Sequence, residues 1–131
     1  MSEILEEIQR RFYGKLIGTK KLKHYVSEVV STLPEDIQDD LIESCWFVGS
    51  MKDAWAYTFT GNDLKNQHLI FLSDDLLSQD PIQIRFSIAH EIGHVIKGHR
   101  NSIEIKQSKE EVTIQEKEAD EFASAYFPRP S

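Results

Sequence analysis

The spacing of apolar residues predicts a helical N-terminal third. Residues 3–13 place apolar side chains three or four positions apart, which is the period of an amphipathic helix. A second helical pattern covers residues 22–33 and stops before Pro34, because a residue that precedes proline disfavours helical geometry. Residues 35–44 show a shorter pattern of the same kind. We therefore expect three helices before residue 45.

Short apolar runs replace this pattern after residue 44. Trp46, Phe47 and Val48 form a run that Gly49 closes, and an aromatic and β-branched cluster occupies residues 54–60. Turn residues follow at 61–63, and another apolar run covers 68–72. Together these features predict a small, mainly antiparallel sheet.

Two further helices are expected in the C-terminal half. Asp80 is a candidate N-cap, Pro81 suits the first helical position, and Gly98 supplies a stop. This helix is apolar on more than one side, which predicts that it is buried. After a polar stretch at 100–110, a last helix is expected at about 111–127, before Pro128.

The length of 131 residues suits one domain. We expect a single α+β domain over residues 1–131, with a helical part at 1–44. The sheet and the two long helices would occupy 45–131.

Composition excludes several classes of function. The formal net charge of −7 disfavours direct binding to nucleic acid, which needs a basic face. No apolar run approaches the roughly 18 residues of a membrane span, and the acidic N-terminus does not resemble a secretory signal. Cys45 is the single cysteine, so an internal disulfide is excluded. These features predict a cytoplasmic protein that uses neither a membrane nor a nucleic acid.

The buried helix contains the sequence His90-Glu91-Ile92-Gly93-His94, which has the form H-E-x-x-H. On a helix, the two histidines are separated by about 40° around the axis and about 6 Å along it, so both rings can reach one ion. Zinc suits imidazole ligands, and Glu91 lies beside the metal as a general base for an activated water.

Two other interpretations compete with a metal site. A chain of this composition carries H-E-x-x-H by chance in about 2 cases of 100. The histidines could also be core residues that find ordinary hydrogen bonds. However, burying three ionisable groups together costs several kcal/mol unless something compensates them, and a metal ion would do so.

The last helix offers candidates for a third ligand. By helical spacing, Glu116 and Asp120 share a face with small alanines, so Glu116 could bind the ion while Asp120 holds a ligand histidine. Glu118 is the alternative ligand. Thr113-x-x-Glu116 is also a capping-box pattern, in which Glu116 would only bind the backbone. Ser108-x-x-Glu111 offers the same pattern earlier and would leave Glu116 free. His99 lacks the spacing of a known extended motif and is expected to lie outside the ligand set.

The sequence resembles the ImmA/IrrE family of metallopeptidase-like proteins. The resemblance covers roughly residues 68–128 and rests on two motifs in order: the segment 85–94 after the strand at 70–72, and the segment 116–123 before Pro128. It implies a zincin-like fold in which a small sheet packs against the H-E-x-x-H helix. It also implies that His90, His94 and Glu116 bind zinc and that Glu91 is the base. Family members are often paired with a helix-turn-helix repressor.

These observations support three hypotheses. The leading one is a zinc metalloendopeptidase that cleaves an intracellular protein, such as a helix-turn-helix transcriptional regulator. The second is a non-catalytic zinc-binding module that regulates a repressor or an antitoxin by contact alone. The third is a structural fold without a metal.

Overall fold

The computed structural model describes residues 3–12, 14–49, 68–96 and 109–129. Its elements follow the chain as α1 (Glu3–Phe12), β1 (Leu16–Ile17), α2 (Lys20–Thr32), α3 (Glu35–Ser44), β2 (Cys45–Val48), β3 (His68–Phe71), α5 (Asp74–Leu77), α6 (Pro81–Ile96) and α7 (Lys109–Tyr126). The three helices expected before residue 45 and the two long helices expected after residue 80 are all present. The strand expected at 54–60, the turn at 61–63 and the stop at Gly98 lie outside the described residues.

The three described strands form a parallel sheet in the order β1-β2-β3. In its register, Phe47 of β2 pairs with Leu16 on one side and with Ile70 on the other. The expectation of a mainly antiparallel sheet is therefore wrong for these strands, although the α+β content is as expected. The physical reason is the connection between β1 and β2. Helices α2 and α3 return the chain to its starting end, so β2 runs in the same direction as β1.

Strand β1 was not expected, and it adds a strand to the helical part at 1–44. Its two residues are too few to show a period of their own. It follows a turn at Gly14, whose φ of 80° favours glycine because that angle brings a side chain into steric conflict. Backbone bonds then join the strands, as the Gly49 amide donates to the Ile17 carbonyl at 2.8 Å.

The hydrophobic core lies between the sheet and the helices α1, α2 and α6. Phe12 of α1 meets Phe47 of β2 edge to face, with ring centroids 5.7 Å apart. Val26 and Val29 of α2 are fully buried in the same cluster. Thr19 fixes the start of α2, because its hydroxyl accepts a hydrogen bond from the Leu22 amide at 3.2 Å.

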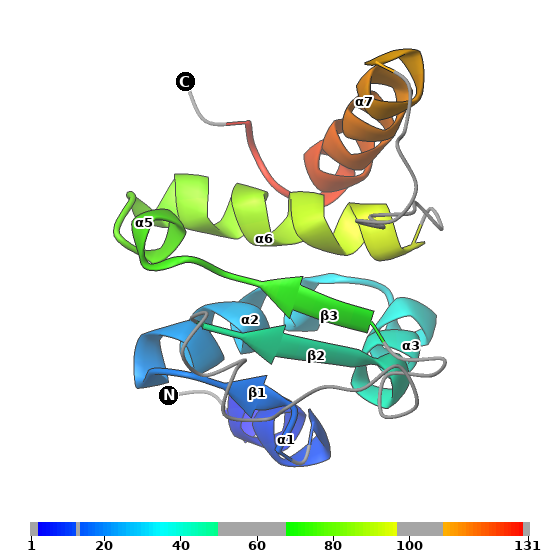
Figure 1. The fold of residues 1–131 in the computed structure, drawn as a ribbon. Helices are drawn as coiled ribbons and strands as arrows, with labels where there is room; N and C mark the ends of the chain where they lie inside the picture. Colours follow the sequence, from blue (N-terminus) through cyan, green and yellow to red (C-terminus); the bar gives the residue numbers. More distant parts are fainter. Residues whose placement is uncertain (1–2, 13, 50–67, 97–108, 130–131) are drawn as a thin grey trace.

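Helix α6 lies along β3, between the sheet and α7 (Figure 1). It starts as the sequence predicts, since the Asp80 carboxylate accepts a hydrogen bond from the Gln83 amide at 3.1 Å. Ile84, Ile88 and Ile92 lie one turn apart and are buried in the core. An ion pair between Arg85 and Glu28 ties α6 to α2.

Helix α7 crosses the C-terminal half of α6 on the side away from the sheet (Figure 1). The two helices approach closely at Gly93, where an added Cβ would lie 3.1 Å from the Cα and the carbonyl oxygen of Ala119. Because α7 begins at Lys109, Thr113 lies inside the helix and the capping-box interpretation of Thr113 and Glu116 is wrong. Ser108, in the alternative box, lies outside the described residues.

Among the helices that can be described, none has both the length and the apolar character that a membrane crossing requires.

Candidate metal centre

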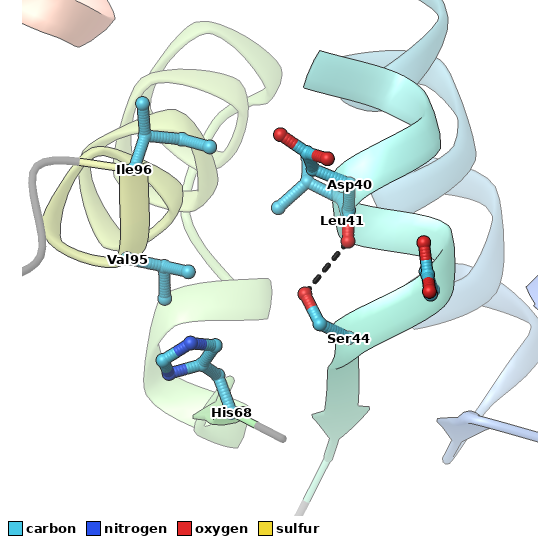
Figure 2. Close-up of a pocket in the computed structure, with 7 residues that line it drawn as sticks. Asp40, Leu41, Ser44, His68, Val95 and Ile96 are labelled. Atoms are coloured by element: carbon cyan, nitrogen blue, oxygen red, sulfur yellow. Dashed lines mark hydrogen bonds between the residues drawn. The ribbon is translucent and has the colours of Figure 1, made fainter. Parts of the chain in front are cut away.

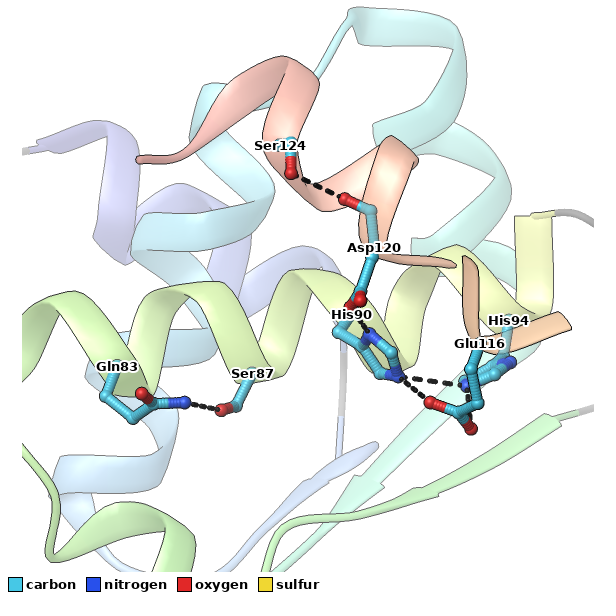
Figure 3. A network of polar contacts seen from close by, with 7 residues as sticks. All are labelled: Gln83, Ser87, His90, His94, Glu116, Asp120 and Ser124. Atoms are coloured by element: carbon cyan, nitrogen blue, oxygen red, sulfur yellow. Dashed lines mark hydrogen bonds and ion pairs between the residues drawn. The ribbon is translucent and has the colours of Figure 1, made fainter. Parts of the chain in front are cut away.

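The α6–α7 crossing brings His90, His94 and Glu116 together (Figure 3). The Nε2 atoms of the two histidines are 3.2 Å apart. Glu116 presents Oε2 to His90 Nε2 at 2.8 Å and Oε1 to His94 Nε2 at 3.3 Å. Two residues one turn apart on α6 and one residue on α7 thus direct three potential ligand atoms at a common point.

Asp120 lies one turn after Glu116 and contacts the other nitrogen of His90. Its Oδ1 is 2.7 Å from His90 Nδ1 (Figure 3). A carboxylate can only accept a hydrogen bond, so Nδ1 carries the proton and donates it. In a neutral imidazole, His90 Nε2 then holds a lone pair that is directed at Glu116 and His94. This arrangement fixes the orientation of the ring and its tautomer.

The chemistry of these atoms calls for a cation. A lone pair on His90 Nε2 facing a carboxylate oxygen at 2.8 Å is repulsive unless a proton or a metal ion lies between them. In a tetrahedral zinc site with bonds of 2.0–2.1 Å, two ligand atoms lie about 3.3 Å apart. The three separations here, of 3.2, 2.8 and 3.3 Å, are close to that distance. These residues therefore fit a zinc ion.

The cluster lies at the edge of the protein interior. The side chains of His90 and His94 are 16% and 8% exposed, whereas that of Glu116 is 54% exposed. The histidines are thus held by packing, and the carboxylate borders solvent. Three protein ligands leave the fourth position of a tetrahedral ion for water or substrate, as in catalytic zinc sites.

Glu91 lies on α6 next to His90 and is half-buried. Burial raises the pKa of its carboxyl above the ordinary value. The His90 ring acts in the opposite direction, and the nearby Glu116 carboxylate raises the pKa further. A carboxylate with a raised pKa is a better proton acceptor near neutral pH, which is the requirement for a general base.

The other residues weighed for this site have different outcomes. Glu118 lies on α7 outside the three-residue cluster. His99 lies outside the described residues. The roles assigned to His90, Glu91, His94, Glu116 and Asp120 remain predictions, although the fold brings the four side chains of His90, His94, Glu116 and Asp120 into direct contact.

Gln83 and Ser87 were not predicted as site residues, although they lie on the same face of α6 as the two histidines (Figure 3). Gln83 Nε2 donates to Ser87 Oγ at 3.0 Å. The signal that could have identified them is the spacing of 83, 87, 90 and 94, which repeats at intervals of three and four residues.

A cavity of about 270 Å³ lies between the C-terminal turn of α6, the end of α3 and the start of β3 (Figure 2). Its lining comprises Asp40, Leu41, Glu43, Ser44, His68, Val95 and Ile96. It shares no residue with the metal cluster, so the cavity and the cluster are separate features.

The chain matches a model of a known family. The model described as the IrrE N-terminal-like domain, of the peptidase M78 group, matches residues 49–127, which is more than half of the chain. No curated protein and no solved structure matches the chain.

Proposed function

Because the chain belongs to the IrrE N-terminal-like peptidase family, we propose that it is a zinc-dependent endopeptidase of the zincin type. Membership confirms the resemblance drawn from the two motifs and makes the chain a metallopeptidase-like domain. The proposal goes further in naming the metal and the reaction. Its substrate would be another intracellular protein, and the resemblance favours a helix-turn-helix transcriptional regulator.

The observation that carries this proposal is the convergence of three acceptor atoms on one point. His90 Nε2, His94 Nε2 and the Glu116 carboxylate meet, while Asp120 accepts a hydrogen bond from Nδ1 of His90. A zinc ion bound there would supply a Lewis acid and lower the pKa of a water molecule towards neutrality.

The protein residues would divide the remaining work. Asp120 holds the His90 ring in the tautomer that presents Nε2, and burial restricts the ring of His94. Glu91 takes a proton from the attacking water and passes it to the leaving amine. Its raised pKa favours both transfers near neutral pH, because the carboxyl can hold the proton between them.

The decisive experiment separates metal binding from proton transfer. Glu91→Gln keeps the size of the side chain and removes the base, so zinc content should stay at the wild-type level. Turnover of fluorescein-labelled casein, and of a candidate helix-turn-helix regulator, should fall by about 10²–10⁴-fold. Glu121→Gln is the matched control, because Glu121 is an exposed carboxylate on α7 outside the cluster.

His94→Ala supplies the metal arm of this experiment. A structural zinc site yields roughly 10–16 kcal/mol, so losing one of three protein ligands, at about 3–5 kcal/mol each, should weaken zinc binding by on the order of 10³-fold. Elemental analysis and a competition assay with a chelator would measure it. Wild-type turnover by Glu91→Gln would contradict the peptidase mechanism, and unchanged zinc affinity in His94→Ala would contradict the metal site.

The second candidate is a zinc-binding module that regulates its partner by contact alone. The net charge of −7 favours it, because an acidic surface complements a basic DNA-binding protein. Under this hypothesis, the Glu91→Gln variant would still regulate the partner, whereas removal of zinc would abolish the regulation.

A further inference from the structure

Helix α6 carries a polar stripe that extends beyond the metal cluster. At 100° per residue, Gln83, Ser87, His90, Glu91 and His94 fall within about 100° of one another around the helix axis. The only other charged side chain between 81 and 96 is Arg85, on the opposite face, where it pairs with Glu28. A helix that is otherwise buried and apolar therefore presents one continuous row of polar groups.

The N-terminal part of this stripe is two neutral side chains that bind each other. Gln83 Nε2 donates to Ser87 Oγ at 3.0 Å, and both residues are half-buried. Within the described part of the chain, neither side chain makes another hydrogen bond. It leaves the Gln83 carbonyl oxygen as an acceptor and the Ser87 hydroxyl as a donor. Both groups can therefore bind a ligand without breaking the existing bond.

The position of the pair relates it to the metal cluster. Ser87 precedes His90 by three residues and Gln83 precedes it by seven, which is about 4.5 Å and about 10 Å along the helix axis. An extended peptide advances by about 3.3 Å per residue. A substrate whose scissile carbonyl lies at the metal would thus bring its first residue past Ser87 and about its third past Gln83.

We propose that Gln83 and Ser87 position the substrate by hydrogen bonding to the residues on one side of the scissile bond. This inference rests on the proposed peptidase function. The two side chains are neutral, so they select hydrogen-bonding groups rather than charge. Such groups are the main-chain amides of the substrate or a polar side chain next to the scissile bond. A solvated helix face is the alternative, and the two make different predictions for binding.

Hydroxamates test the proposed positioning by Gln83 and Ser87 without requiring turnover, because the hydroxamate group binds the zinc itself. Acetohydroxamate probes the metal alone. Tripeptidyl hydroxamates extend from the same group towards the N-terminal side of the scissile bond, and succinyl hydroxamates coupled to a tripeptide extend towards its C-terminal side. Dissociation constants would be measured by calorimetry with the zinc-loaded protein.

In the wild type, one series should bind more tightly than acetohydroxamate. Ser87→Ala and Gln83→Ala should each weaken that series by roughly 3- to 10-fold, the value of one net hydrogen bond. Their affinity for acetohydroxamate should not change. Ser87→Thr should restore binding because it keeps the hydroxyl. Ser124→Ala is the control, since Ser124 is a half-buried serine on α7 that binds the Asp120 carbonyl.

A second arm distinguishes the two sources of the hydrogen bond. If the main chain supplies it, peptides with leucine and asparagine at the adjacent position should lose equal affinity in Ser87→Ala. If a side chain supplies it, only the asparagine peptide should lose affinity. Both results support positioning by the pair.

Two outcomes would overturn the inference, and they are distinguishable. If acetohydroxamate does not bind to protein supplied with zinc, the proposed metal function fails and the inference fails with it. If acetohydroxamate binds but the extended series behaves identically in the wild type and both alanine variants, the pair does not position substrate and the zinc site stands.

Discussion

The two sides on which α6 is packed use different kinds of contact. Towards the sheet and α2, it buries the branched side chains of Ile84, Ile88 and Ile92. Towards α7, it presents Gly93 to Ala119, so that the helices touch through small residues. The first side excludes water over a large apolar area, and the second brings backbones together beside a row of ionisable groups.

This difference separates stability from chemistry. Apolar burial contributes about 25 cal/mol for each Å² removed from water, so the sheet side holds α6 in place independently of any ion. The α7 side also buries apolar side chains, such as Phe122 and Ala123, but its charged groups oppose one another without a cation. We therefore expect a protein that folds without metal and whose α6–α7 crossing tightens when zinc binds.

The largest effect on stability should come from weakening the apolar packing of α6 on its sheet side. Ile88 is fully buried, so Ile88→Ala should lower the free energy of unfolding by about 2–5 kcal/mol through lost burial and a cavity. Urea unfolding of the metal-free protein would measure it. Zinc affinity of the folded variant should stay within about twofold. Ile82→Ala is the control, because Ile82 lies on the same helix and is 48% exposed. A large loss of zinc affinity in Ile88→Ala would contradict the separation of the two sides.

A smaller effect on stability should follow from titrating the thiol of Cys45, which lies on strand β2 of the sheet. Burial raises the pKa of the Cys45 thiol from 9.0 to about 11. Because the folded state then holds the proton more tightly than the unfolded state, stability is complete below pH 9 and falls as the pH rises to 11. The loss should be about 1 kcal/mol at pH 10 and about 2 kcal/mol at pH 11. The measurement is the difference in unfolding free energy between wild type and Cys45→Ala. A difference that does not change with pH would show that Cys45 is not shielded from water.

The α7 side was easier to predict from the sequence than the sheet. The spacing of His90 and His94 and the shared face of Glu116 and Asp120 fix which side chains can meet, because helical periodicity is local. The close approach at Gly93 was not predicted, since a helical glycine has no distinctive pattern and its role depends on Ala119.

The direction of the strands could not be predicted from local patterns in the same way. The apolar run at β2 is compatible with either pairing, because β2 is almost wholly buried and shows no alternation. The parallel arrangement lies in pairings between distant segments: β1 pairs with β2 about thirty positions later, and β2 pairs with β3 more than twenty positions later. That information is in the tertiary contacts rather than in any window of sequence.

The smallest expected effect tests the α7 side at Gly93. In Gly93→Ala, the new methyl would lie 3.1 Å from the Ala119 backbone and 3.3 Å from Phe122 Cβ, so α7 must move by a few tenths of an ångström. Alanine also favours a helix over glycine by about 1 kcal/mol, so the free energy of unfolding should change by less than about 1 kcal/mol.

The displacement should appear instead in metal binding, because Glu116 and Asp120 move with α7 while the histidines stay on α6. We expect zinc affinity to fall by roughly tenfold, which is the lower end of the effect of disturbing groups that orient metal ligands. A chelator competition assay would measure it. Adding Ala119→Gly should not restore affinity, because the new methyl meets the backbone of residue 119 rather than its side chain. Unchanged affinity in Gly93→Ala would show that the histidines and the α7 carboxylates adjust independently of the helix crossing.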